Sequence, residues 1–579
     1  QVSLLRFASQ CYPGRVEYVD HCIGVSGRAL ASRGYEPLSV NRKAGRELPV
    51  ECVEALLRLL SIPLRSMGLG VLSLTEYVDL MHFLPWESQK QVSLELLRSV
   101  LSKESALSDL DCVDKLLGMI APILRDPPAG DGREDPPDAT MQAALEEERR
   151  LVARVVHLMR NDDTDQYFRM LVVARRHLGQ GASSQVQYTL VPLVFRALGL
   201  ARTIRAAERA EDERATAAKA YAAAAEAAAA EAAARKSTNE GTDDSATEKE
   251  KGGVGGEGGE GEGHEEGTGN GDASASNGSA GVDGAAASSS AGREDDGGGD
   301  AGHEGVAAAG SQAGTEEGAG AGGGDVAMPP PPPLAPSKPR QFSSRKAYQF
   351  LHEIVTAMAP LHPWTSLTLF LQCALGADHT GFKAIAYEFF SQAFILYEDE
   401  LTDSKAQVRA LVSMAGTLLA CYGFDPADYD ALATKTAQYA AKLLKKPDQC
   451  RMVTLCSHLF WSPDEDAPGR RDPRRVLECL QRSLKIADVC IAGGVNAQLF
   501  IEILNHYLFF FEANNPEIAG RYISGLVALI NEHIESLDPS DARSEMERYF
   551  ANTVDHIRRK KTQDDLPEKL REKFASVQI

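Results

Sequence analysis

The chain has 579 residues, and its 61 Lys and Arg residues are outnumbered by 82 Asp and Glu residues, which gives a net charge of −21. This balance argues against nonspecific binding to nucleic acid or to an anionic membrane surface. The chain is too long for one compact core, so we expect several units or one elongated repeat array.

The ten cysteines are scattered along the chain, and no two are spaced Cys-x-x-Cys. This usage is typical of buried thiols in a reducing compartment. No uncharged apolar run reaches about 18 residues, so we predict no transmembrane segment. The chain starts without Met and without a targeting signal, and we expect it to be a fragment of a longer protein.

Residues 1–204 have helical periodicity and almost no strand signal. Apolar residues from Val50 to Leu60 cluster on one side of a predicted helix. A loop rich in Pro and Gly follows Arg125, and helix resumes at about 141. The next helix should open with the stretch from Asn161 to Asp163, which are good N-cap residues, and close on Gly179. This first piece is therefore predicted to be an α-solenoid segment.

Residues 205–340 have a different composition. Their Ala-rich start should extend the preceding helix. The remainder is mostly Gly, Ala, Glu, Asp and Ser, ends in a polyproline run, and carries roughly two-thirds of the net charge. It lacks the apolar residues needed to offset the entropy of ordering, so we predict a disordered acidic insertion. A tolerated surface insertion is a better interpretation than a proline-motif ligand.

Residues 341–579 are again predicted to be helical, with short caps between helices and a flexible tail. One helix should start at Asp472 and Pro473 and end on the glycines before Val495. A later helix has a wide apolar stripe, formed by Leu499, Phe500, Ile503, Leu504, Tyr507, Leu508 and Phe511. Antiparallel helices with broad stripes and short turns predict an all-α fold, a HEAT-like α-solenoid of antiparallel helix pairs interrupted by the insertion.

Signals for catalysis are weak. No phosphate-binding loop, nucleophile elbow or metalloprotease motif occurs in a suitable context. The acids at 398–403 are best explained as a helix end and a solvated turn. Cys450, Cys456 and His458 form the best metal candidate, but the two Cys are six residues apart and lack a zinc-knuckle turn, so we expect buried thiols. We predict no catalytic residue, no cofactor, no metal site and no enzyme activity.

The segment from 447 to 461 is predicted to be one helix whose apolar face leaves His458 and Trp461 close together at one edge. Trp461 has two interpretations. It packs in the core, or it is an interface anchor on the rim of the solenoid, where Trp is a common hot-spot residue.

Several long motifs carry a family resemblance. YEFFSQAFILYEDELTDSKAQ, KLLKKPDQCR, HLFWS, RRVLECLQRSLKIA and AQLFIEILNHYLFFFE resemble the C-terminal half of the retromer large-subunit family, vacuolar protein sorting-associated protein 35. The earlier CYPGRVEYVD, NDDTDQYFRMLVVARRHLG and YTLVPLVFRA resemble it in the same order. The resemblance covers residues 1 to about 202 and about 342 to about 561.

The resemblance implies a non-catalytic scaffold, peripheral on the cytosolic face of endosomes, that serves retrograde transport to the trans-Golgi network or plasma membrane. It implies a small partner subunit with a metallophosphoesterase fold, bound by the C-terminal half. Further implied partners are sorting nexins, a small GTPase of the late endosome, an actin-nucleating complex and cargo receptor tails. The implied candidate contacts are His458, Leu459, Phe460 and Trp461, with Asn505 and Tyr507 weaker.

Two departures from the family pattern matter. The PRLYL motif that grips an arrestin-like subunit is absent from this sequence, which puts binding of that subunit in doubt. The insertion at 205–340 replaces a shorter connection and should loop out at a cost of about 0.6 kcal/mol per doubling of loop length. An alternative function for the same architecture is a HEAT-type regulatory subunit or transport receptor acting elsewhere.

Overall fold

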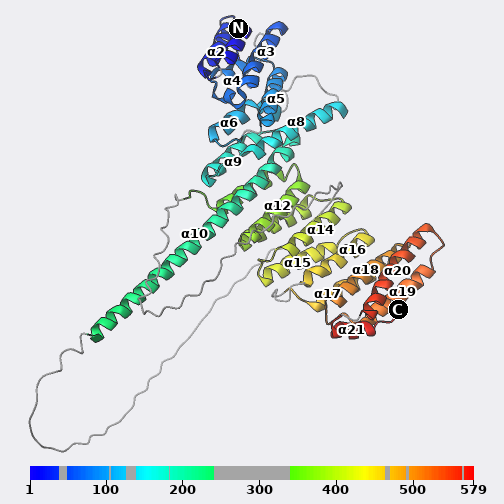
Figure 1. Ribbon diagram of the computed structural model, residues 1–579. Coiled ribbons are helices and arrows are strands. Elements are labelled where there is room, and N and C mark those ends of the chain that lie inside the picture. The colour runs from blue at the N-terminus through cyan, green and yellow to red at the C-terminus, as the bar shows by residue number, and fades with distance from the viewer. Residues whose placement is uncertain are drawn as a thin grey trace, which may run out of the picture. The chain divides into compact units, whose positions relative to one another are not determined.

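The structure is a computed structural model, and it describes residues 1–12, 14–37, 48–103, 106–125, 139–181, 183–239, 340–462, 470–490, 494–563 and 566–579. Within these ranges every regular element is a helix, and extended pairing is confined to isolated bridges (Figure 1). The predicted all-α class is confirmed.

The first half of the chain forms helices of very different lengths, and the last of them has 57 residues. Its elements are α1 (Val2–Cys11), α2 (Val16–Ala31), α3 (Val50–Met67), η1 (Gly68–Ser73), α4 (Glu76–Met81), α5 (Trp86–Ser102), α6 (Leu110–Met119), α7 (Ala121–Leu124), α8 (Ala139–Leu158), α9 (Thr164–Leu178) and α10 (Ser183–Asn239). The predicted cap is confirmed, because the Asp163 carboxylate accepts hydrogen bonds from the N–H groups of Asp165 and Gln166. Gly179 is the C-cap of α9, also as predicted.

One described stretch, Val50–Ser73, is long and apolar enough by composition to cross a membrane. It includes α3, which ends at Met67, and the turn η1. Leu56, Leu60 and Leu64 of α3 are buried in the protein core. The apolar content of this stretch is therefore explained by packing inside the fold, as in other core helices.

The second half is a regular series of helix pairs. Its elements are α11 (Ser344–Met358), α12 (Pro363–His379), α13 (Lys383–Asp399), α14 (Ser404–Ala420), α15 (Pro426–Ala440), α16 (Lys446–Cys456), η2 (Ser457–Phe460), α17 (Pro473–Asp488), α18 (Val495–Glu512), α19 (Gly520–Glu535), α20 (Asp541–Thr562) and α21 (Glu568–Ala575). Consecutive helices pack on each other, and α12, α14, α16, α18 and α20 stack in order (Figure 1). This is the predicted HEAT-like α-solenoid.

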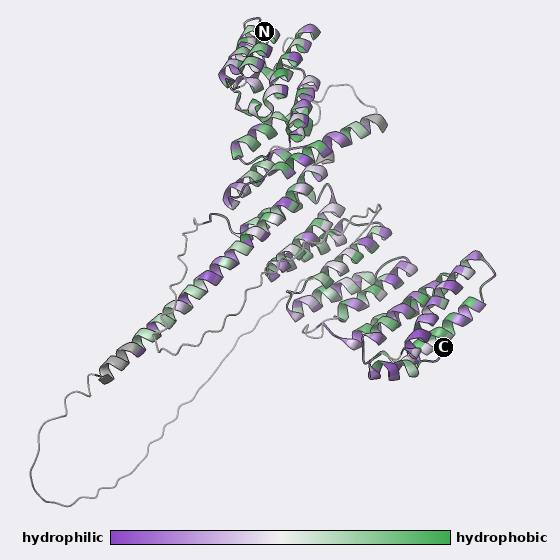
Figure 2. Ribbon diagram, viewed as in Figure 1, coloured by the Kyte–Doolittle hydropathy of each residue, from purple (hydrophilic) through white to green (hydrophobic). Residues whose placement is uncertain are grey.

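The buried apolar residues form one contiguous cluster that runs from Leu5 to Val577. Figure 2 shows hydrophobic and hydrophilic residues interspersed along each helix, as expected for helices that bury one face. A continuous core made by stacking neighbouring helices is the physical basis of a solenoid.

The two predicted solenoid segments meet across the insertion. Residues 1–206 and 340–579 belong to one compact unit. The Arg340 guanidinium donates a hydrogen bond to the carbonyl oxygen of Ile204 (3.1 Å), and the rings of Phe168 and Phe342 lie 4.6 Å apart. The segment that follows the insertion therefore lies beside the segment that precedes it. The predicted helical extension is confirmed by α10, which continues to Asn239, whereas the predicted disordered segment at 240–339 lies outside the described residues.

Two predicted helix ends are wrong. The helix that starts at Pro473 ends at Asp488, not at the later glycines, because the N–H of Cys490 closes a tight turn onto the carbonyl oxygen of Ala487. Gly494 instead precedes α18 in a left-handed conformation with φ of 76°, which glycine adopts without strain.

The predicted single helix over 447–461 is also wrong. The helix α16 ends at Cys456, and the chain continues as the 3-10 turn η2. Trp461 then has an extended backbone with φ of −144°. The cause is pairing with a returning segment: the N–H of Asp472 bonds to the carbonyl oxygen of Phe460, and the N–H of Ser462 bonds to the carbonyl oxygen of Arg470, both at 2.8 Å. His458 and Trp461 therefore do not share one helix face.

Candidate partner-binding face

The outward side of α18 is a stripe of partly exposed residues. They recur every three or four positions, which places them on one side of a helix. The members are Gln498, Glu502, Asn505, His506, Phe509 and Glu512. Because α16 and α20 pack on either side of α18, this stripe and the flanking residues of its neighbours form one surface, called the α18 face below.

On the α16 side, two side-chain contacts hold the α18 face together. The Arg451 guanidinium donates two hydrogen bonds to the Glu502 carboxylate, at 2.8 and 3.0 Å. The Nε2 of His458 lies 2.8 Å from the Nδ1 of His506. Such a bidentate pair and a ring-to-ring hydrogen bond fix η2 and α16 against α18.

His458 and His506 are held in their neutral form by burial. Burial, together with the neighbouring His506, lowers the pKa of His458 to about 4. Burial also lowers the pKa of His506. The His458 ring lies 4.9 Å from the rings of both Phe509 and Phe510, so its surroundings are largely apolar. A charged imidazole is disfavoured in such a place.

On the α20 side, the polar side chains are paired as well. The Asn505 amide donates to the Tyr549 hydroxyl (3.0 Å) and accepts from the Thr553 hydroxyl (3.1 Å). Glu512 contacts His556 Nε2 at 2.6 Å and Lys560 Nζ at 3.2 Å. The carboxylates of Glu502 and Glu512 on the α18 face are therefore both paired.

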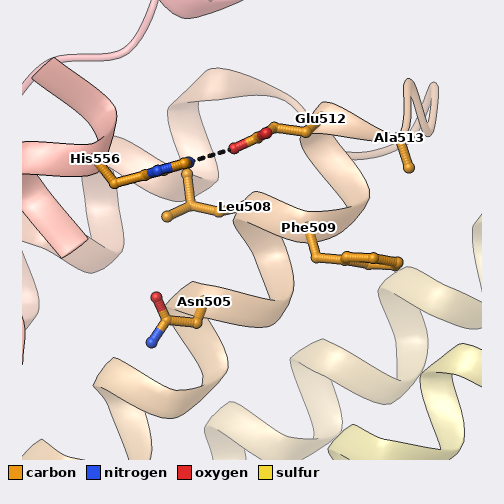
Figure 3. A pocket seen from close by; sticks show the side chains of 6 residues that line it. All are labelled: Asn505, Leu508, Phe509, Glu512, Ala513 and His556. Carbon is orange, nitrogen blue, oxygen red and sulfur yellow. Dashed lines mark hydrogen bonds and ion pairs between the residues drawn. The ribbon is translucent and has the colours of Figure 1, made fainter. Parts of the chain in front are cut away.

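An open hollow of about 470 Å³ lies on the outward side of α18, and His556 of α20 reaches its edge (Figure 3). Its lining residues are Asn505, Leu508, Phe509, Glu512, Ala513 and His556. Figure 3 shows His556 reaching from the neighbouring helix toward Glu512. The side chain of Phe509 is 48% exposed, and it is the most apolar of the outward residues of α18.

The structure places most of the predicted contact residues inside the fold. Leu459, Phe460, Trp461 and Tyr507 are at most 6% exposed, whereas His458 and Asn505 are partly exposed on the α18 face. The Arg471 guanidinium lies 5.0 Å from the Trp461 ring centroid. Of the two interpretations of Trp461, the geometry favours core packing. The role of all six residues in partner binding stays a prediction.

Comparison with known proteins decides the family. A family model described as vacuolar protein sorting-associated protein 35 (Vps35) matches residues 1–533. The chain belongs to the Vps35 family. Its relatives include the Arabidopsis thaliana protein 35B, which is 28% identical over 96% of this chain and 54% of its own length. The Schizosaccharomyces pombe protein 35 is 42% identical over 32% of this chain and 23% of its own length.

This Vps35-family chain spans about half the length of the Arabidopsis relatives that it matches, including protein 35A at 27% identity over 100% of the chain and 56% of the relative. Among solved structures, a circular tandem repeat protein covers 99% of the chain and 92% of itself at 9% identity. Its TM-score of 0.27 is too low to add to the assignment.

Phe509 is the exposed residue that sequence reasoning missed in this Vps35-family chain. Leu508, Phe509, Phe510 and Phe511 are four consecutive apolar residues in α18. At about 100° per residue they cover most of the helix circumference, so one of them must face away from the core. That signal was present in the sequence, but only the burial pattern identifies Phe509 as the outward one.

Cys450 and Cys456, two members of the metal candidate that the sequence offered, are both buried in the core. Cys450 is fully buried, and its Sγ donates to the carbonyl oxygen of Ser483 at 3.4 Å. Burial raises the pKa of Cys450 to about 12 and also raises the pKa of Cys456. Within the described ranges, no group of three His, Cys, Asp or Glu side chains could hold a metal ion.

Proposed function

We propose that this chain is a scaffold subunit of the retromer coat, which organises a cargo-selective complex for retrograde transport from endosomes to the trans-Golgi network or plasma membrane. The observation that carries this proposal is the Vps35 family match over residues 1–533. The HEAT-like solenoid supports it, because stacked helix pairs offer extended surfaces for several partners at once.

The proposed partner of the C-terminal solenoid is a small subunit with a metallophosphoesterase fold. The α18 face is the proposed contact surface, with His458 and Asn505 as its partly exposed candidate contacts. Leu459, Phe460, Trp461 and Tyr507 would then act from beneath, by fixing η2 and α18 in place. An interface of this kind needs rigid support below its exposed residues, and the buried aromatic cluster supplies it.

The proposed site of action is the cytosolic face of endosomes, where the chain is peripheral and has no enzymatic role. Sorting nexins, a small GTPase of the late endosome, an actin-nucleating complex and cargo receptor tails are further proposed partners. The arrestin-like subunit is not assigned to these residues, because the motif that grips it in the family is absent from this sequence.

The test is calorimetric titration of the chain with the metallophosphoesterase-fold subunit from the same organism. We expect saturable binding that Asn505→Ala weakens about tenfold, a loss of about 1.4 kcal/mol, which is in the range of a residue that contributes strongly to an interface. Asn531→Ala is the matched control, because Asn531 is exposed on α19 and lies outside the α18 face. Absence of binding by well-folded chain would overturn the proposal, and equal losses in both variants would remove the α18 face as its surface.

A further inference from the structure

The C-terminal segment, residues 566–579, covers the end of the solenoid through a small apolar contact. It consists of α21 and the residues that flank this helix. The Phe574 ring is fully buried and meets the ring of Phe511 on α18 edge-on, with 5.1 Å between the ring centroids. The other buried apolar side chains of the segment are those of Leu566, Leu570 and Val577. The segment therefore shields apolar surface of the solenoid from water.

The C-terminal segment also lies directly against the first turn of α19. Gly520 is the first residue of α19, and a Cβ atom at this position would lie 3.3 Å from Val577 Cγ2 and closer still to Ser576 Oγ. The backbone N–H of Gln578 donates a hydrogen bond to Ser524 Oγ at 2.7 Å. A side chain at position 520 would therefore push against the segment, so this position can be used to displace it.

Lys573 opposes this contact. Its Nζ is buried and has no hydrogen-bond partner in the part of the chain that the structure describes. The Nζ lies 5.4 Å from the centroid of the Phe511 ring, but such a cation–π contact recovers only part of the hydration that a buried ammonium loses. Burial accordingly lowers the pKa of Lys573. Because water can hydrate this ammonium once the C-terminal segment has left the solenoid, the charge favours the detached state.

We propose that the C-terminal segment is a detachable cap, which leaves the solenoid while the helices beneath it stay folded, and that the charge of Lys573 sets how often it leaves. Apolar burial favours the seated state, and the unpaired ammonium favours the detached state. Any change that neutralises this amine shifts the equilibrium toward the seated state, and detachment uncovers Phe511 and the start of α19.

The cap goes beyond the function proposed above. The family match ends at residue 533, so the whole C-terminal segment lies outside the matched residues. The equilibrium between the seated and detached states needs no small subunit and no coat.

The test is amide hydrogen exchange of the full chain, measured by mass spectrometry on peptides from the C-terminal segment and from α18. Lys573→Met removes the charge and keeps a long side chain. Lys569→Met is the matched control, because Lys569 is an exposed lysine of the same helix. Phe574→Ala removes an apolar anchor, and Gly520→Leu places a side chain where the segment lies. Circular dichroism checks that each variant is folded.

We expect the amides of the C-terminal segment to exchange at least about tenfold faster than those of α18, because the cap opens by itself. Lys573→Met should slow exchange of the segment at least about threefold, and Lys569→Met should leave it unchanged. Phe574→Ala and Gly520→Leu should speed it at least about threefold without changing exchange in α18.

Three results would overturn the proposal. The first is exchange of the segment and α18 at one common rate, which would mean that the segment opens only with the whole fold. The others are a Lys573→Met variant that exchanges like the wild type and equal slowing by the two lysine substitutions. Since the small subunit is absent from this assay, failure of the proposed function would not alter the result.

Discussion

At the residue scale, the segment HLFWS divides its side chains between two tasks. Leu459, Phe460 and Trp461 are buried, and the guanidinium of Arg475 lies 3.9 Å from the Phe460 ring centroid. His458 instead contacts His506 at the edge of the α18 face. Substitutions of Leu459, Phe460 or Trp461 should therefore change the stability of the fold. His458, in contrast, links this core to the surface.

Trp461→Ala should destabilise the fold. Removing a large aromatic side chain that is only 6% exposed leaves a cavity and costs about 3 to 5 kcal/mol. The measurement is the free energy of unfolding in urea, with Phe195→Ala as a control at an exposed aromatic position. A variant that kept its stability but lost the small subunit would contradict the core assignment and restore Trp461 as an interface anchor.

The pair of His458 and His506 predicts a specific pH dependence. Because the pKa of His458 falls to about 4 in the folded chain, from an ordinary 6.5, the unfolded chain binds more protons between these values. The stability from neutral His458 is complete above about pH 6.5 and is lost as pH falls toward 4, by at most about 3 kcal/mol.

His458→Leu removes that titrating group, so it should reduce the loss of unfolding free energy between pH 7 and about pH 4.5 by about 2 to 3 kcal/mol. His379→Leu is the control, because His379 is exposed at the end of α12. Urea unfolding at the two pH values measures the difference. Identical pH slopes in the wild type and His458→Leu would count against a buried neutral pair.

At the scale of elements, local signals in the sequence were enough where a helix end depends on nearby residues. The caps Asp163 and Asp472 were predictable, because each accepts hydrogen bonds from N–H groups two and three residues later. The end of α16 was not, since Phe460 and Ser462 pair with residues that return about ten positions later. The periodicity of apolar residues does not show that a later segment of the chain folds back and pairs with these residues.

The α18 face shows the same limit. His458 and Asn505 were found through motif resemblance, and the structure brings both to this surface. Phe509 depended on which side of α18 the neighbouring helices cover, and a run of four apolar residues leaves that undetermined. Burial of Tyr507, which is fully enclosed, agrees with its place in the predicted apolar stripe of α18, whereas its role as a contact residue came from the resemblance alone.

The start of α11 offers a test at this scale. The Asp165 carboxylate on α9 accepts hydrogen bonds from the N–H groups of Gln341 (2.8 Å) and Phe342 (3.1 Å). Asp165→Ala should lower the unfolding free energy by about 1 to 2 kcal/mol and speed amide exchange at the start of α11. Asp162→Ala, at an exposed position nearby, is the control. Unchanged exchange at Gln341 and Phe342 would show that the contact of Asp165 with the segment before α11 contributes nothing measurable.

At the scale of the whole molecule, contacts at or outside the two ends of the 205–340 stretch close the fold across it. Arg205 donates to the carbonyl oxygen of Thr380 (3.1 Å), and Arg175 pairs with Glu353 at 2.5 Å. Together with the contact of Arg340 with Ile204, these bonds join α9 and the first part of α10 to the segment that starts at Arg340. The solenoid core should therefore form without residues 207–338.

Replacing residues 207–338 with about eight Gly and Ser residues should leave the solenoid folded, because the two ends already lie together at Ile204 and Arg340. The shorter connection lowers the entropy of closing the loop, by about 0.6 kcal/mol per halving, so the melting temperature should stay constant or rise by a few degrees. Circular dichroism and thermal melting of the shortened chain provide the measurement, and a variant that keeps the insertion but scrambles the order of residues 240–337 controls for its composition. Loss of helical signal from the shortened chain alone would mean that the insertion supports the solenoid. The contacts of Arg340 and Arg205 would then be insufficient to hold the two segments together.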